Sequence, residues 1–146
     1  MDPEAELETF IAKFSEGVAT QVRAARAIMR ARLPGAFELA YDNYNALAIG
    51  YSATPKLSGV VFSIAAYPRW VSLFFMGGPG LQDPKGLLKG SGVRVRHIVL
   101  TTPDDLNHPD VVFLMDQALS RTPIEASQAG HLIIQSISAK QRPRRP

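Results

Sequence analysis

The chain of 146 residues contains no cysteine. It therefore forms no disulfide bond, and no thiolate is present to act as a nucleophile or to ligate zinc or an iron–sulfur cluster. It also lacks long apolar runs, since no stretch approaches the roughly 18 apolar residues of a membrane-spanning helix. The first six residues, MDPEAE, are acidic where a secretory signal peptide would be basic. These absences predict a cytoplasmic protein that does not enter a membrane.

Complete catalytic and metal-binding motifs are also missing. The only three histidines are His97, His108 and His131, and none forms an i, i+4 ligand pair of the kind that holds zinc or iron on a helix. The segment 50–54 approaches the G-x-S-x-G nucleophile motif but lacks its last glycine and leads to Pro55. The sequence therefore predicts a binding protein with no catalytic activity.

Positive charge is scarce outside the C-terminus. The net charge is +3, and the last eight residues contribute four positive charges, which leaves residues 1–139 with −1. We expect a single domain over 1–138 followed by a basic disordered tail over 139–146. Nucleic acid is the least favoured partner, because so few charges give only weak, salt-sensitive binding. That hypothesis rests on the tail and on a basic helical stripe formed by Arg23, Arg26 and Arg30.

Two kinds of hydrophobic periodicity are present. Apolar residues recur at steps of three and four over 4–32, which predicts a short helix, a bend near Ser15 and a longer second helix. Alternation then predicts strands over 37–42 and 46–51, and more continuous apolar runs predict central strands over 59–66 and 70–76. Further strands are expected over 94–100 and 131–138, with one helix or two over 103–121. Short connections favour antiparallel pairing. The predicted fold class is α+β, an antiparallel sheet of five to six strands with N-terminal and C-terminal helices on one face.

A glycine-rich connection, GGPGLQDPKGLLKGSG (77–92), offers a second kind of site. It opens into a strand, whereas a phosphate-binding glycine loop opens into a helix. Backbone amides around Ser91 are a candidate anion nest, with basic side chains nearby and aromatic residues in the adjacent strands. The alternative is a turn with solvated lysines and aromatics in the core. The candidate residues for a small anionic or planar ligand are Tyr44, Tyr67, Trp70, Lys85, Lys89, Ser91, Arg94 and Arg96.

Three segments resemble the YdhG-like domain family: LQDPKGLLKGSGVRVRHIVL (81–100), LPGAFELAYDNYNALAIGY (33–51) and SISAKQRPRRP at the C-terminus. The resemblance extends over nearly the whole chain. It implies a frataxin-like sandwich of helices on a sheet. Because some YdhG-like proteins are described as iron-handling chaperones, the resemblance also implies iron as a candidate cofactor. It implies no catalysed reaction.

In this chain, the residues that correspond to the iron site implied by the resemblance are carboxylates on the first helix and the adjoining strand. Hard cations such as Fe(II) accept carboxylate oxygen, and Glu4 and Glu8 are one helical turn apart. The alternative is a solvated acidic surface. The candidate metal ligands are Glu4, Glu8, Glu16, Glu38 and Asp42. Whether the chain forms a homodimer through an exposed strand edge is left open by the sequence.

Overall fold

Two helices open the chain, each beginning at a side-chain cap. Helix α1 (Pro3–Ile11) follows Asp2, whose carboxylate accepts the Ala5 N–H at 2.8 Å. Helix α2 (Glu16–Arg32) follows Ser15, whose hydroxyl accepts the Val18 N–H at 3.4 Å. Such caps satisfy amides that have no partner inside the helix. The predicted bend near Ser15 is confirmed.

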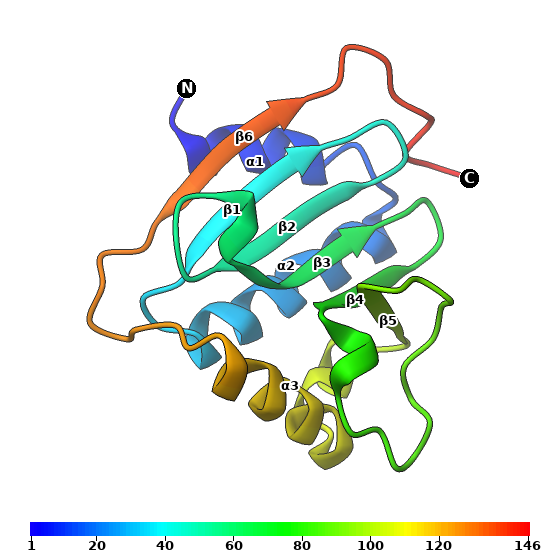
Figure 1. Cartoon of the computed structure of the whole chain (residues 1–146). Coiled ribbons are helices and arrows are strands. Elements are labelled where there is room, and N and C mark those ends of the chain that lie inside the picture. Colours follow the sequence, from blue (N-terminus) through cyan, green and yellow to red (C-terminus); the bar gives the residue numbers. More distant parts are fainter.

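Six strands form one sheet in the computed structural model, which describes residues 1–146 (Figure 1). Their order across the sheet is β5-β4-β3-β2-β1-β6. The first five form an antiparallel meander, as expected. The bounds are β1 (Phe37–Asp42), β2 (Leu47–Ser52), β3 (Val60–Ala66), β4 (Val71–Met76), β5 (Val95–Leu100) and β6 (Leu132–Ile137).

The prediction of a purely antiparallel sheet is wrong at one edge. Strand β6 pairs in parallel with β1, with Leu132 opposite Glu38 and Ile134 opposite Ala40. Between β5 and β6 the chain forms a short 3-10 turn and helix α3 (Pro109–Arg121). A connection that includes a helix is long enough to return the chain to the far edge in the direction of β1. The sheet is therefore mixed.

The three helices lie on one face of the sheet (Figure 1). Alternate residues of the strands face these helices and form a continuous core, in which Phe62 and Phe75 meet edge to face with 5.6 Å between ring centres. Burial of this apolar surface is the main force that holds the helices to the sheet. The opposite face carries no α-helix, and we call it the helix-free face.

The C-terminal segment 139–146, expected to be a disordered tail, contains no helix or strand but makes defined contacts. The Arg142 N–H donates to the Tyr44 carbonyl at 2.9 Å, and the Gln141 amide donates to the Asp42 carbonyl at 3.1 Å. Arg144 is only 5% exposed. The segment therefore follows the end of β1 and the turn after it.

None of the helices combines the length and the apolar character needed to cross a bilayer.

Candidate functional site

The turn between β3 and β4 places two aromatic rings face to face. The Tyr67 N–H donates to the Trp70 carbonyl at 2.9 Å, which closes the turn over Pro68 and Arg69. The rings of Tyr67 and Trp70 stack with 4.7 Å between centres and 14° between planes. Partial burial raises the pKa of Tyr67, so its hydroxyl stays protonated at neutral pH. Trp70 is 42% exposed, so the pair presents an aromatic surface to solvent.

An open cavity of about 600 Å³ lies between this turn and the C-terminal segment. We call it the arginine cavity. Three guanidinium groups, those of Arg69, Arg142 and Arg145, lie on residues that line it, together with Tyr67 and Trp70. All three arginines are exposed, and none is within ion-pair distance of a carboxylate. The cavity therefore combines an aromatic wall with positive charge that no acidic side chain neutralises.

A second depression, of about 530 Å³, lies on the helix-free face of the sheet and adjoins the arginine cavity. Small side chains form its floor, because Ala48 and Ala65 are cross-strand partners and Ser63 lies on the same face. Tyr67 and Asn45 line both hollows. Its larger side chains are Tyr44, Tyr67, Phe74 and Met76.

These two hollows suit a ligand with an apolar planar body and an anionic group. Aromatic side chains bind planar rings by stacking, and arginine guanidinium groups donate paired hydrogen bonds to carboxylate or phosphate. No nucleophile, acid–base pair or metal ligand set lines the arginine cavity.

The structure separates the two halves of the predicted ligand set. Tyr67 and Trp70 lie in the arginine cavity and Tyr44 in the adjoining depression. The predicted residues of the glycine-rich connection line neither hollow. These residues are Lys85, Lys89, Ser91, Arg94 and Arg96.

The glycine-rich connection instead packs against α3. The Asp83 carboxylate accepts the amides of Leu87 and Leu88 at 2.9 Å each, which folds the connection on itself. Gln82 exchanges two hydrogen bonds of 2.9 Å with Gln117 of α3. These contacts fix residues 82–88 of the connection, and the anion nest considered around Ser91 stays a prediction. Two of the four predicted basic residues there have local partners: Lys85 lies 4.0 Å from Asp110, and Arg96 donates to the Gly92 carbonyl at 2.8 Å.

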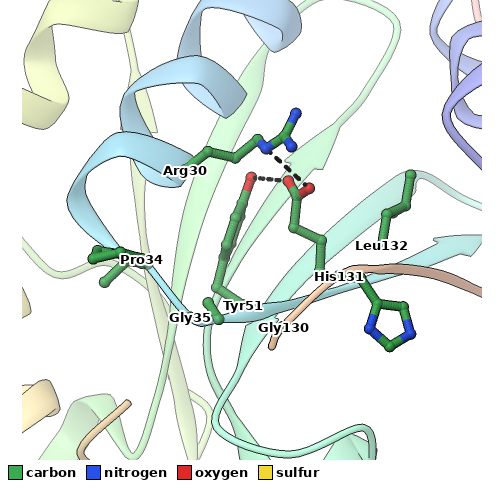
Figure 2. Close-up of a pocket in the computed structure, with 10 residues that line it drawn as sticks. Arg30, Pro34, Gly35, Tyr51, Gly130, His131 and Leu132 are labelled. Carbon is green, nitrogen blue, oxygen red and sulfur yellow. Dashed lines mark hydrogen bonds and ion pairs between the residues drawn. The ribbon is translucent and has the colours of Figure 1, made fainter. Parts of the chain in front are cut away.

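One predicted metal ligand, Glu38, is buried in an ion-pair cluster (Figure 2). Arg26 donates to both of its carboxylate oxygens, at 3.0 and 2.9 Å, and the Tyr51 hydroxyl donates at 2.9 Å. Arg30 Nε lies 3.5 Å away. Burial, then the charge of Glu38, raises the pKa of Tyr51 well above its usual value. We call these four residues together with Glu4 the Glu38 cluster.

The other predicted metal ligands also face basic side chains, with one exception. Glu4 accepts Arg26 at 2.9 Å, and this hydrogen bond lowers the pKa of Glu4. Glu8 accepts Arg23 at 2.6 Å, and Asp42 is paired with Arg144. Glu16 is exposed at the start of α2 and makes no ion pair. No group of three or more histidine, aspartate or glutamate residues is arranged to hold a metal ion. Iron binding stays a prediction.

Sequence reasoning missed the arginines of the C-terminal segment as site residues. Arg142 and Arg145 are distant in sequence from Tyr67 and Trp70, and no local pattern indicates that the C-terminal segment returns to this turn. The one available signal is that four basic residues concentrate in the last eight positions. Comparison with known proteins adds no further guide, since no protein-family model, curated protein or solved structure matches the chain.

Proposed function

We propose that the protein is a non-catalytic binding protein for a small planar anion. The ligand's ring lies against Trp70 and Tyr67, and its carboxylate or phosphate meets Arg142 and Arg145. One observation carries this proposal: three arginines without acidic partners surround a stacked, exposed aromatic pair. Elsewhere in the molecule, buried or clustered arginines are matched by carboxylates.

The family assignment is part of the proposal. A YdhG-like, frataxin-like sandwich is supported by the three helices on one face of the sheet. In this arrangement the helix-free face of the sheet and the turns at the ends of its strands are the surfaces that can bind a ligand. The parallel pairing of β6 with β1 is the feature of this sheet that our expectation did not include.

Energetics favour a ligand that uses both parts of the arginine cavity. Stacking on an aromatic side chain contributes roughly 1–3 kcal/mol in nucleic-acid complexes. A hydrogen bond to a charged group contributes about 1.5–3 kcal/mol. Because the cavity is open to water, stacking alone or a charged hydrogen bond alone gives only weak binding. A ligand that carries both a ring and a negative charge is therefore favoured.

The test compares three probes that separate ring from charge. Naphthoate has both, naphthylmethanol has the ring alone, and inorganic phosphate has the charge alone. Each is titrated into isotope-labelled protein and followed by amide and indole NMR signals. We expect naphthoate to shift the signals of 67–70 and 142–145 and to bind about tenfold or more tightly than either other probe, as one charge-assisted hydrogen bond would provide. Equal binding of naphthoate and naphthylmethanol would reject the proposed charge recognition.

A pair of variants locates the charge that matters. Arg142→Ala with Arg145→Ala removes two positive charges from the arginine cavity, whereas Lys85→Ala with Lys89→Ala removes two from the glycine-rich connection. The first should weaken naphthoate binding about tenfold or more, and the second by less than about twofold, because contact and not net charge sets the affinity. If both double variants weaken naphthoate binding equally, the overall positive charge of the protein, and not contact with Arg142 and Arg145, attracts the anion.

Anaerobic Fe(II) titrated into the same labelled protein tests the competing, family-derived proposal. A paramagnetic ion broadens the amides nearest to it. Broadening confined to residues 2–16 and 38–42, without any response to naphthoate, would favour iron handling over the arginine cavity. We expect the carboxylates there to prefer the arginines they already contact.

A further inference from the structure

One arginine of the C-terminal segment differs from the rest. Arg144 is 5% exposed, whereas Lys140, Arg142 and Arg145 are exposed. Its Nη2 atom donates to Asp42 Oδ1 at 2.9 Å and to the Asn43 carbonyl at 2.6 Å. Arg144 is therefore the buried charged side chain among several contacts that attach the segment, which also include Gln141 to the Asp42 carbonyl, the Arg142 amide to Tyr44 and Arg145 to the Lys13 carbonyl.

The slot that receives Arg144 is built by the domain. Asp42, fully buried at the end of β1, supplies the counter-charge. The Phe14 ring lies 5.6 Å from the guanidinium carbon, a cation–π distance. Lys13 approaches the second oxygen of Asp42 at 3.4 Å and is largely solvent-exposed. A buried carboxylate needs such a partner, because removing an unpaired charge from water is unfavourable.

The fit of Arg144 in this slot is incomplete. Its Nε and Nη1 atoms are buried without a hydrogen-bond partner. Each of these donors has lost its bonds to water and gained none, which opposes the favourable bonds at Nη2. The attachment through Arg144 is therefore weaker than a fully satisfied buried arginine would provide.

Attachment through Arg144 determines the shape of the arginine cavity. Its neighbours in sequence, Arg142, Pro143, Arg145 and Pro146, all line that cavity. When Arg144 leaves its slot, the cavity loses this wall and two of its three arginines.

We infer that residues 139–146 form a strap, fastened by Arg144 in the Asp42 slot, whose closure completes the arginine cavity and is coupled to anion binding. This inference rests on the proposed function. The anion contacts the strap only when the strap is closed, so it favours the closed state, and closure by the same linkage favours the anion. Arg144 acts as a positioning residue that does not itself touch the ligand.

The strap has two reporters that need no ligand. The Arg142 amide donates to the Tyr44 carbonyl only when the strap is closed, so its hydrogen exchange reports opening. Trp70, the single tryptophan of the chain, faces the strap across the cavity, so quenching of its fluorescence by acrylamide reports the same event.

The test compares Arg144→Ala with Lys140→Ala, which removes the same charge from an exposed position of the same segment. In Arg144→Ala we expect exchange of the Arg142 amide about tenfold faster, stronger quenching of Trp70 and naphthoate binding about tenfold weaker, in proportion to the lost closed state. Lys140→Ala should change each by less than about twofold. Far-ultraviolet circular dichroism checks that both variants are folded. Unchanged protection of the Arg142 amide in folded Arg144→Ala would overturn the inference.

Free guanidinium ion tests whether the cation in the Asp42 slot must be covalently linked to the strap, or whether any cation in that slot is sufficient. At low millimolar concentration it can occupy the slot vacated in Arg144→Ala, but it has no covalent link to the strap. We expect it to leave Arg142 exchange and naphthoate affinity unrestored. Restoration of both would show that the slot only needs to be filled, and would overturn the strap.

The ligand-free readouts keep this inference separate from the proposed function. If the wild-type protein does not bind naphthoate, the proposed function and the coupling both fail. Exchange and quenching then still decide whether Arg144 fastens the strap. If naphthoate binds wild type and Arg144→Ala equally, the proposed function stands and the coupling is wrong.

Discussion

Two groups of arginines in this protein have opposite surroundings. In the Glu38 cluster, Arg26 donates to Glu38 and Glu4. The Tyr51 hydroxyl, labelled in Figure 2, donates to the Glu38 carboxylate as well. In the arginine cavity, Arg69, Arg142 and Arg145 have no carboxylate within reach. The first group lies between α2 and the sheet, and the second lies where the β3–β4 turn meets the C-terminal segment.

The difference separates a structural role from a binding role. Burial alone would lower the pKa of Arg26, but its hydrogen bonds to Glu38 and Glu4 outweigh burial and raise it. Charges matched in this way stabilise the charged state of both partners and leave little to offer a ligand. The arginines beside the aromatic surface have no acidic partner; apart from the bond of Arg145 Nε to the Lys13 carbonyl at 3.2 Å, their guanidinium groups are available to an anion. Stability should therefore respond to changes in the Glu38 cluster, and affinity to changes in the arginine cavity.

The largest expected effect on stability comes from Glu38→Gln. The change removes the buried negative charge whose two oxygens accept hydrogen bonds from Arg26. Removing one partner of a buried ion pair lowers the free energy of unfolding by about 3–5 kcal/mol. Urea unfolding measures the loss. Arg69→Ala in the arginine cavity is the control and should change the free energy of unfolding by less than about 0.5 kcal/mol. If both variants lose the same stability, the contrast between the two groups is wrong.

Tyr51→Phe should have a smaller effect, about 1 kcal/mol, because it removes one buried hydrogen bond while Arg26 still donates to Glu38. It should also alter the alkaline pH dependence. The pKa of folded Tyr51 is raised above its usual 10.0, so its contribution to stability is complete below pH 10.0 and is lost as pH rises through the folded value. Chemical unfolding from pH 8 to pH 11 measures this. An unchanged alkaline slope in Tyr51→Phe would contradict it.

The sequence predicted local structure well because its causes are local. Asp2 and Ser15 cap helices through amides three residues ahead, and alternation along β1 and β2 reflects one face turned to the helices. The direction of β6 has no such signal. An alternating strand reads the same whether its neighbour runs parallel or antiparallel, so only the path of the chain through α3 decides it.

The candidate site was half predictable for the same reason. Tyr67 and Trp70 are joined by one tight turn, so their proximity follows from the sequence. The return of Arg142 to Tyr44 depends on a long-range contact that periodicity does not encode. The acidic first helix shows the converse problem. Its carboxylates were noticed, and so was the basic stripe of α2, but only the fold shows that the two face each other.

The smallest expected effect comes from Glu4, the exposed carboxylate of the Glu38 cluster. Its hydrogen bond with Arg26 lowers its pKa from 4.5, so its stabilising contribution is complete above pH 4.5 and is lost as pH falls through the lowered folded value. Since the Glu4 side chain is 52% exposed, solvent screens the pair, and Glu4→Gln should remove only about 0–1 kcal/mol at neutral pH. Glu6→Gln removes the same charge from the same helix, at a position without an ion pair, and serves as the control. Acid unfolding of the two variants should therefore differ, with a shallower loss of stability below pH 4.5 in Glu4→Gln alone. If the two variants lose stability identically below pH 4.5, Glu38 alone stabilises the charge of Arg26, and the Glu4–Arg26 pair does not contribute to stability.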